Sequence, residues 1–473
     1  MSRNSVLKKL SISTFANFFV LLVSVFSTLV FPKVLSVEDY SYWQIYVFYT
    51  GFVTIAGLGW TDGVYLKNGG KDYKSLERAV YSFQTYGMSV FLAFIFVMIG
   101  VMAWFYISDI KLATIVVLAC VEGVIFNLRI YPLQLLQATD RISDFSIAVV
   151  IGRSSFFVAS LLLILVGKVD LYLFVLCDIL GCVCCSIFGF VKCRDKLLGK
   201  PCGFAQGVYE IKNNISIGFS LMAANMVGIA ITGVIKYAVQ TYWSVVEFGK
   251  ISLSITCTNL FLKFTTALGT VLFPMLCNYA IEKLKSIYAS VNTLLEYTIA
   301  VIMIFYYPAK LVLSIYLPQY AESLSYMGYL LPICLFETKV SLLLNTYYKA
   351  MRKEKVLMII NLVDLCLSIV LAVLSTLLFS NITMAVFSIL IVLAVRSIVL
   401  ELLLCKKYLK LKNKFTGFFS LLIAVVFVVT NGFVGGWLGV AIYAVFVGFA
   451  IIIGRRKIKS GFEVFSRRKT NEK

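Results

Sequence analysis

Ser36-Val-Glu-Asp-Tyr-Ser-Tyr-Trp43 is the stretch around which the rest of the chain can be organised, because a related stretch, Ser244-Val-Val-Glu-Phe-Gly-Lys-Ile251, follows about 208 residues later. Each copy lies between two apolar runs. A second pair has nearly the same spacing: Gln137-Ala-Thr-Asp-Arg141 and Lys349-Ala-Met-Arg-Lys353. Two matching pairs in register predict a duplicated unit of roughly 200 residues.

The composition is typical of a membrane protein. Hydrophobic residues make up 60% of the chain and charged residues only 14%, far from the balance of a soluble domain. The first apolar run, Ile12–Phe31, contains no charge and is long enough to cross ~30 Å of hydrocarbon. It is too long for a signal-peptide core, so we expect a retained first helix. Many such runs follow, which predicts an all-α polytopic membrane protein.

We expect about fourteen transmembrane helices. The apolar runs predict them at 12–31, 42–62, 80–104, 112–137, 144–166, 169–191, 214–239, 246–274, 292–316, 326–348, 357–379, 382–404, 416–431 and 434–454. The first six form a predicted N-terminal lobe, 1–200, and the next six a C-terminal lobe, 201–405. Residues 406–473 add two helices and a basic tail. An even number of helices per unit makes the two repeats parallel.

The basic residues test this placement. The termini and the even-numbered loops hold 32 of the 43 Lys and Arg residues, whereas the odd-numbered loops hold only Lys33, Lys111 and Lys168. This asymmetry predicts that both termini lie in the cytoplasm. Because the net charge of +20 is concentrated in short loops between apolar spans, we interpret it as a topology signal and a contact with anionic membrane lipids, not with nucleic acid.

Several chemistries are excluded or disfavoured. The chain has no histidine, which excludes Ser-His and Cys-His catalysis within it. Most of the 12 cysteines lie in apolar runs, and the cluster Cys182, Cys184 and Cys185 lacks the spacing of a zinc site. No P-loop motif occurs. We therefore expect no enzyme, no metal and no cofactor.

Cations inside the apolar spans are the candidate binding residues, because each one costs several kcal/mol unless it faces water or a partner. Counting residues from the cytoplasmic turns puts Arg129 and Arg153 ~16–20 Å deep on adjacent helices. Lys263 and Lys339 lie at similar depth in the second half. Four cations at comparable depth predict an anion-attracting cavity at the interface of the repeats. Snorkelling or local ion pairs are the alternative.

Acidic residues also fall inside the spans, among them Glu122, Asp178, Glu296 and Asp364. Two interpretations remain open. These carboxylates could carry coupling protons or sodium ions, or they could neutralise the basic residues.

The layout resembles the Wzx-type polysaccharide flippases of the multidrug/oligosaccharidyl-lipid/polysaccharide exporter superfamily. The likeness rests on an apolar first helix, on Leu35–Trp43, on Gly57-Leu-Gly59, and on Ser244–Ile251 at the opening of the second lobe. It covers nearly the whole chain through degenerate motifs. Ser41 stands where the family often has glycine, whereas Gly249 in the second copy fits better.

The resemblance implies two six-helix bundles around a cationic cavity, in the bacterial inner membrane. It implies alternating-access flipping of an undecaprenyl-diphosphate-linked oligosaccharide for O-antigen, lipopolysaccharide or capsule-type biosynthesis, coupled to an ion gradient. A polysaccharide polymerase and chain-length proteins are implied as further partners. No residue is carried over by a motif match. A diphosphate needs forked cationic donors, which Arg129 and Arg153 supply.

Two other functional classes are less consistent with the sequence. A polysaccharide polymerase or ligase resembles proteins with a long outward loop, whereas the outward loops here are short. A multidrug exporter of the same superfamily usually has an acidic residue in the first helix, and Ile12–Phe31 has none. Flippases of other lipid-linked glycans remain a further possibility.

Overall fold

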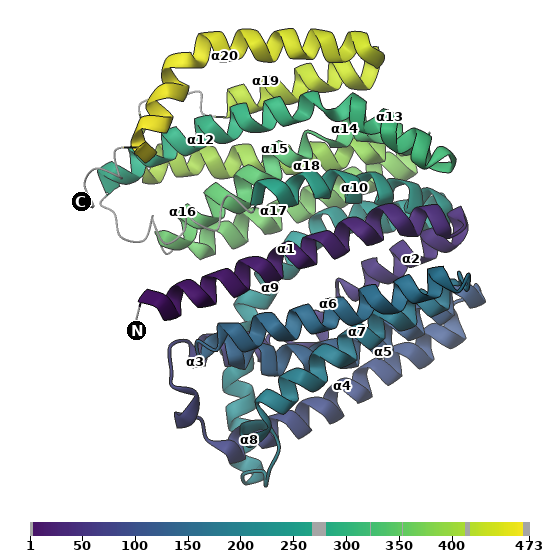
Figure 1. The fold of residues 1–473 in the computed structure, drawn as a ribbon, viewed down its shortest axis with the longest axis vertical. Helices are drawn as coiled ribbons and strands as arrows, with labels where there is room; N and C mark the ends of the chain where they lie inside the picture. Colours follow the sequence, from purple (N-terminus) through teal and green to yellow (C-terminus); the bar gives the residue numbers. More distant parts are fainter. Residues whose placement is uncertain (1–2, 267–280, 322, 352, 412–416, 467–473) are drawn as a thin grey trace. The chain divides into compact units, whose positions relative to one another are not determined.

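The computed structural model describes residues 3–266, 281–321, 323–351, 353–411 and 417–466. Every regular element within these ranges is a helix (Figure 1). The chain divides into two compact units, Met1–Ile229 and Ala230–Lys473. The predicted boundaries at 200 and 405 remain a prediction.

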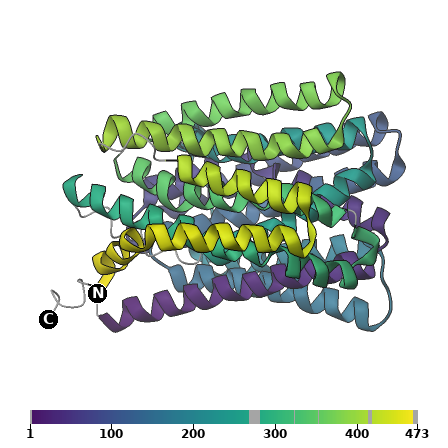
Figure 2. The ribbon, with the colours of Figure 1, turned by 90° about the horizontal axis from the view of Figure 1, so that it is seen from above.

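Within the described residues, the first unit contains eight α-helices, two short 3₁₀ helices and the beginning of a ninth α-helix. In chain order they are α1 (Arg3–Val34), α2 (Val37–Thr50), η1 (Val53–Gly57), α3 (Trp60–Asn68), η2 (Tyr73–Ser75), α4 (Arg78–Tyr106), α5 (Ile110–Ala138), α6 (Ile142–Leu165), α7 (Leu171–Lys192), α8 (Arg194–Leu197) and the first part of α9 (Phe204–Tyr242), with η1 and η2 as short 3₁₀ turns. The long helices α4, α5, α6 and α7 run side by side (Figures 1 and 2).

The second unit takes the rest of α9 and a more broken set of helices. These are α10 (Val245–Thr266), α12 (Ile281–Ile304), α13 (Tyr306–Tyr316), η4 (Pro318–Tyr320), η5 (Ser323–Tyr326), α14 (Met327–Leu330), α15 (Ile333–Thr338), η6 (Lys339–Leu344), α16 (Asn345–Ala350), α17 (Glu354–Val373), η7 (Leu374–Leu378), α18 (Ile382–Leu403), η8 (Leu404–Tyr408), α19 (Phe418–Phe427), η9 (Val428–Val434) and α20 (Gly436–Ser466). Four segments, η6, η7, η8 and η9, are π-helical. The helix α12 packs along α20, and α17 packs along α18.

Ten helices among the described residues are long and apolar enough to cross a membrane, and a bent pair, Ser323–Leu330 with Ile333–Lys349, makes eleven. Each of the fourteen expected ranges overlaps a helix, but several ranges are interrupted. The expected helix 42–62 breaks where Leu58 and Gly59 adopt left-handed backbone angles, φ 49° and 80°. The number fourteen therefore stays a prediction.

The repeated stretches begin their helices in the same way. Ser36 caps α2, where its Oγ accepts a hydrogen bond from the amide of Asp39 at 3.0 Å. Ser244 caps α10, where its Oγ accepts from the amide of Glu247 at 3.1 Å. A serine at this position satisfies an amide that the helix itself leaves unpaired.

The second matching pair of stretches, 137–141 and 349–353, also shares one backbone hydrogen bond. The amide of Arg141 donates to the carbonyl of Leu136 at 2.8 Å, and the amide of Lys353 donates to the carbonyl of Tyr348 at 2.8 Å. In both copies this bond closes the end of one helix immediately before the next helix begins. Both sequence matches thus correspond to matching local structures, as a duplicated unit requires.

Aromatic rings join four helices of the first unit. The fully buried ring of Phe31 lies 5.0 Å from Trp43, 5.9 Å from Phe156 and 4.6 Å from Phe174, measured between ring centroids. These residues come from α1, α2, α6 and α7. Edge-to-face aromatic contacts add specific attraction to the area they bury, so the end of the stretch Ser36–Trp43 is anchored in the core.

Glycines allow α3 to contact the backbone of α9 directly. A Cβ atom on Gly63 would lie 1.8 Å from the carbonyl oxygen of Asn214, and one on Gly218 would lie 2.0 Å from the carbonyl oxygen of Gly59. Neither carbonyl can move as a flexible side chain does. The close approach of the two helices in the first unit therefore requires glycine.

We expect Gly63→Ala to lower the midpoint of thermal unfolding in detergent, because the added methyl group pushes α3 away from α9. Gly228→Ala, in α9, is the matched control: no atom lies within 4 Å of the added methyl group, and alanine favours a helix by up to ~1 kcal/mol over glycine. Equal midpoints for the two variants would contradict the backbone contact.

Candidate functional site

Four of the charged residues predicted from the sequence meet in one cavity of the first unit. Glu122 and Arg129 come from α5, Arg153 from α6 and Asp178 from α7. The cavity has a volume of about 280 Å³. We call these four residues and the space between them the arginine pocket.

A close contact between α6 and α7 brings the pocket together. A Cβ atom on Gly181 would lie 2.6 Å from the carbonyl oxygen of Gly152, so the two backbones touch at this point. Arg153 directly follows Gly152, and Asp178 lies one helical turn before Gly181. The contact therefore places the side chains of Arg153 and Asp178 at the same level along the two facing helices.

The contacts within the pocket are loose. A guanidinium nitrogen of Arg153 lies 3.6 Å from a carboxylate oxygen of Asp178, and the hydroxyl of Tyr46 donates to the other oxygen of Asp178 at 3.4 Å. The guanidinium carbon of Arg129 lies 4.4 Å from the centroid of the Phe126 ring. Such distances are long for charge-assisted hydrogen bonds.

Two buried polar atoms of the pocket lack a hydrogen-bond partner in the part of the chain that the structure describes. They are Nε of Arg129 and Oε2 of Glu122. A guanidinium has five N–H donors, so two arginines with loose contacts leave donors for an anionic group. Two arginines and two ionised carboxylates balance in charge, which means that an anion must compete with Asp178 for Arg153.

The second unit holds a tighter cluster, which we call the lysine triad: Lys339, Glu296 and Glu401. The ammonium group of Lys339 lies 2.7 Å from Oε1 of Glu296, 2.7 Å from Oε2 of Glu401 and 2.7 Å from Oγ of Ser420. Lys339 is 1% exposed. Lys339 donates hydrogen bonds to Glu296 and Ser420 and forms an ion pair with Glu401. Its predicted contact with substrate stays a prediction.

The remaining predicted residues lie elsewhere. Asp364, on α17, is buried, and its Oδ2 makes no hydrogen bond within the described ranges. Lys263 belongs to α10, but its side chain lies outside the described part of the structure. Two of the predicted cations thus share one pocket in the first unit, and one is paired in the second.

Arg396 is a buried cation that the sequence analysis missed. Its Nε donates to Oδ1 of Asn361 at 3.0 Å, and its Nη1 donates to Oε1 of Glu337 at 3.2 Å. It lies in the middle of the apolar range 382–404. The rule that selected Arg129 and Arg153 would have found it too.

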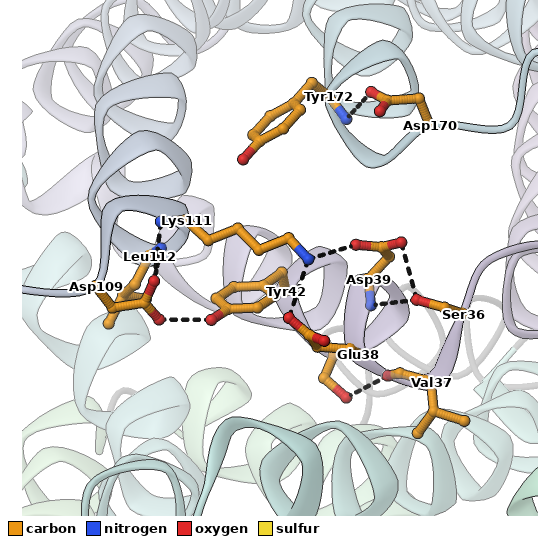
Figure 3. Close-up of polar contacts among 11 residues, drawn as sticks. Ser36, Val37, Glu38, Asp39, Tyr42, Asp109, Lys111, Leu112, Asp170 and Tyr172 are labelled. Atoms are coloured by element: carbon orange, nitrogen blue, oxygen red, sulfur yellow. Dashed lines mark hydrogen bonds and ion pairs between the residues drawn. The ribbon is translucent and has the colours of Figure 1, made fainter.

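A third charged cluster, the Lys111 cluster, fixes the stretch Ser36–Trp43 (Figure 3). The ammonium group of Lys111 lies 3.0 Å from Glu38 and 2.8 Å from Asp39. The hydroxyl of Tyr42 donates to Asp109 at 2.5 Å. Although burial opposes it, the hydrogen bonds from Tyr42 and from backbone amides hold the pKa of Asp109 below its ordinary value. The cluster ties the start of α2 to the start of α5.

Two lysines that each bridge two carboxylates differ in burial, and this predicts different stabilities for their variants. We expect Lys339→Met to cost about 3 to 5 kcal/mol, because it leaves buried carboxylates without their partner. Lys111→Met removes the same number of ion pairs from a side chain that is 32% exposed, and we expect a cost of about 1 kcal/mol or less. Chemical or thermal unfolding in detergent measures both, and similar losses would contradict the buried triad.

No family profile and no curated protein matches the sequence. Solved structures do match. The lipid II flippase MurJ, in an inward closed conformation, is 13% identical over 94% of this chain and 99% of that chain, with a TM-score of 0.66. An inward-facing multidrug resistance transporter of the MATE family and the MOP superfamily is 11% identical over 83% of this chain and 95% of that chain, with a TM-score of 0.61.

A MOP superfamily transporter from Pyrococcus furiosus, described as having a binding pocket of reverse polarity, is 14% identical over 83% of this chain and 93% of that chain, with a TM-score of 0.52. Identities this low establish the fold alone. The many apolar helices and this shared architecture make the chain a multi-pass membrane protein with the fold of MOP superfamily transporters.

Proposed function

We propose that this protein is a flippase that moves a lipid-linked oligosaccharide across the bacterial inner membrane by alternating access. The substrate class is an oligosaccharide on undecaprenyl diphosphate, as used for O-antigen or capsule-type polysaccharides. The observation that carries the proposal is the arginine pocket within the apolar helices of a MOP-type fold.

The chemistry of the pocket suits a phosphate group. Arg129 and Arg153 present forked donors, which bind phosphate oxygens in pairs. The contact between Arg153 and Asp178 is long, at 3.6 Å. A phosphate that replaces Asp178 as the partner of Arg153 therefore breaks only a weak interaction. Apolar walls such as Phe126 and Val149 lower the local dielectric constant and strengthen the attraction between charges.

The orientation of the chain is part of the proposal. The excess of Lys and Arg in the even-numbered loops supports cytoplasmic termini. The lipid-linked substrate then enters from the leaflet in which it is made. A polysaccharide polymerase and chain-length proteins are the proposed consumers of the product.

A multidrug exporter is the second candidate, because Glu122 and Asp178 in the same pocket can attract a cation. The two candidate functions require different charged residues of the arginine pocket. A flippase needs the arginines, whereas an exporter of cationic drugs needs the carboxylates.

Leaflet-resolved chemical labelling of the lipid-linked oligosaccharide tests the function directly. In cells that lack this protein, we expect single repeat units to accumulate on the cytoplasmic face, because translocation is blocked. Accumulation on the periplasmic face would mean that translocation proceeds without it, and would favour a polymerase. An unchanged distribution together with increased drug sensitivity would favour the exporter.

We expect Arg153→Ala to reduce transport at least about tenfold, the effect of losing ~1.4 kcal/mol of binding, while membrane insertion stays intact. Arg153→Lys should retain part of the activity, because lysine keeps the charge but loses the forked donors. Arg194→Ala is the control, since Arg194 is an exposed residue of α8. Normal surface polysaccharide in Arg153→Ala at matched expression would remove this residue from the binding site.

A further inference from the structure

We propose that the arginine pocket takes up protons when it binds a phosphate-type anion, and that Glu122 and Asp178 are the groups that accept them. The inference rests on the proposed function, because it concerns the same pocket. It adds the chemical condition under which that pocket binds an anion. The residues that carry it all belong to the first unit.

The pocket holds its carboxylates beside the arginines that would bind the anion. On α5, Glu122 precedes Arg129 by seven residues, about two helical turns, which puts both on one face of the helix. Between α6 and α7, Asp178 lies 3.6 Å from Arg153. All four line one cavity of about 280 Å³. An anion held by either arginine therefore lies next to a carboxylate.

The proposed ligand brings negative charge that it keeps. In a diphosphate that links a lipid to a sugar, both phosphates are esterified, and each retains one strongly acidic oxygen. The further ionisation that a phosphate monoester shows at about pH 6 is absent. When such an anion meets the carboxylates of the pocket, the carboxylates are the groups that can take up a proton and lose their charge.

The two arginines differ in their present contacts. Among the described residues of the first unit, Arg129 makes no ion pair, and its Nε has no hydrogen-bond partner. Arg153 faces Asp178, and its side chain is 44% exposed. An anion can therefore bind Arg129 without displacing a carboxylate, whereas it must share Arg153 with Asp178.

Protonation of Asp178 releases Arg153 for the anion. The neutral carboxyl group keeps the hydroxyl of Tyr46 as a neighbour at 3.4 Å, because a hydroxyl can accept a hydrogen bond as well as donate one. Oε2 of Glu122, which is buried and makes no hydrogen bond within the described ranges, offers a second position for a proton. Each proton is transferred from hydronium to a carboxylate oxygen and leaves one water molecule behind.

Burial makes this coupling strong. Glu122 is 6% exposed, and the side chain of Asp178 is 20% exposed. The repulsion between a carboxylate and a phosphate at a given distance is several times larger in such surroundings than in water. Anion binding therefore favours protonation of the carboxylates. By linkage, protonation favours anion binding to the same extent.

The other titratable side chains against the two carboxylates do not compete for these protons, because they are uncharged in their ordinary forms. They are Tyr46, Cys177, Cys182 and Cys185. The cations whose charges act on both carboxylates are Arg129 and Arg153. Further along the same helices, charged residues form the Lys111 cluster and the ion pairs at the start of α6.

The coupling has a consequence for transport. Two arginines, two protonated carboxyl groups and a doubly charged diphosphate together form a neutral complex. A neutral complex can be enclosed among apolar helices at a lower cost than a charged one. Proton uptake would thus let the pocket close around an anion inside the membrane.

Isothermal titration calorimetry of the full-length protein in lipid nanodiscs counts the protons. The probe is farnesyl diphosphate with a methyl ester on its terminal phosphate, which has a fixed charge and no sugar. At neutral pH, in buffers with different ionisation enthalpies, we expect uptake of one proton per bound probe, or of two if both carboxylates begin ionised. The dissociation constant should fall about tenfold per unit decrease in pH for each proton taken up.

Neutral side chains of similar shape imitate the protonated pocket. We expect Asp178→Asn and Glu122→Gln each to bind the probe more tightly at neutral pH, with fewer protons taken up, and the double variant to take up none. The control is Asp144→Asn. It removes a carboxylate that pairs with Arg141 and Lys192 outside the pocket, and it should leave both the affinity and the proton count unchanged.

Binding without proton uptake in the wild-type protein, or uptake that persists in the double variant, would overturn the coupling and leave the flippase assignment in place. Binding that Arg129→Gln leaves unchanged would put the probe elsewhere and overturn it as well. A probe that fails to bind at any pH would overturn both the coupling and the arginine pocket as the anion site, while leaflet-resolved labelling still decides the flippase function. Because the wild-type titrations require no variant, a variant that fails to fold does not remove the test.

Discussion

The structure depends on one constraint: a charge among apolar helices must find a partner within the protein. Each cluster meets this constraint in its own way. The lysine triad does so with short contacts around an enclosed ammonium group, and the pocket around Arg153 does so with long contacts at a partly open cavity. Tight pairing stabilises a fold, and loose pairing leaves charge for a ligand. The difference in geometry is the reason for giving the two clusters different roles.

Small residues decide where these charges can meet. Gly152 and Gly181 let α6 and α7 touch next to the arginine pocket, and Gly63 and Gly218 do the same for α3 and α9. Without side chains at these positions, the helix backbones approach closely, as they do in many membrane proteins. Side chains on the neighbouring turns then face each other over short distances. The positions of the charged groups are thus set by glycines that carry no charge.

Much of the fold followed from the sequence. The apolar runs predicted where helices lie, since every expected range overlaps a helix. The breaks were not predicted, because a left-handed turn at Leu58 and Gly59 or a bend near Pro332 leaves an apolar run looking continuous. Hydrophobicity reports whether a segment suits the membrane, not whether its axis is straight.

The candidate site was predicted in part. Counting residues gave a common depth for Arg129 and Arg153, and the structure brings both to one pocket. Depth says nothing about the direction in which a side chain points around its helix, so the pairing of Arg153 with Asp178 and of Lys339 with Glu401 could not be foreseen. Arg396 was overlooked although its position within an apolar run carried the same signal.

The acidic residues at the two helix starts have partners at different distances along the chain. In the second copy, Glu247 pairs with Lys250 at 2.8 Å, one turn further along the same helix. In the first copy, Glu38 and Asp39 pair with Lys111 at the start of α5. During synthesis the second copy can therefore close as soon as its own turn has formed. The ion pairs of the first copy can form only after the beginning of α5 has been synthesised, because a contact distant in sequence forms only after its chain loop has closed. Duplicated segments with one local shape thus differ in the order in which they become fixed.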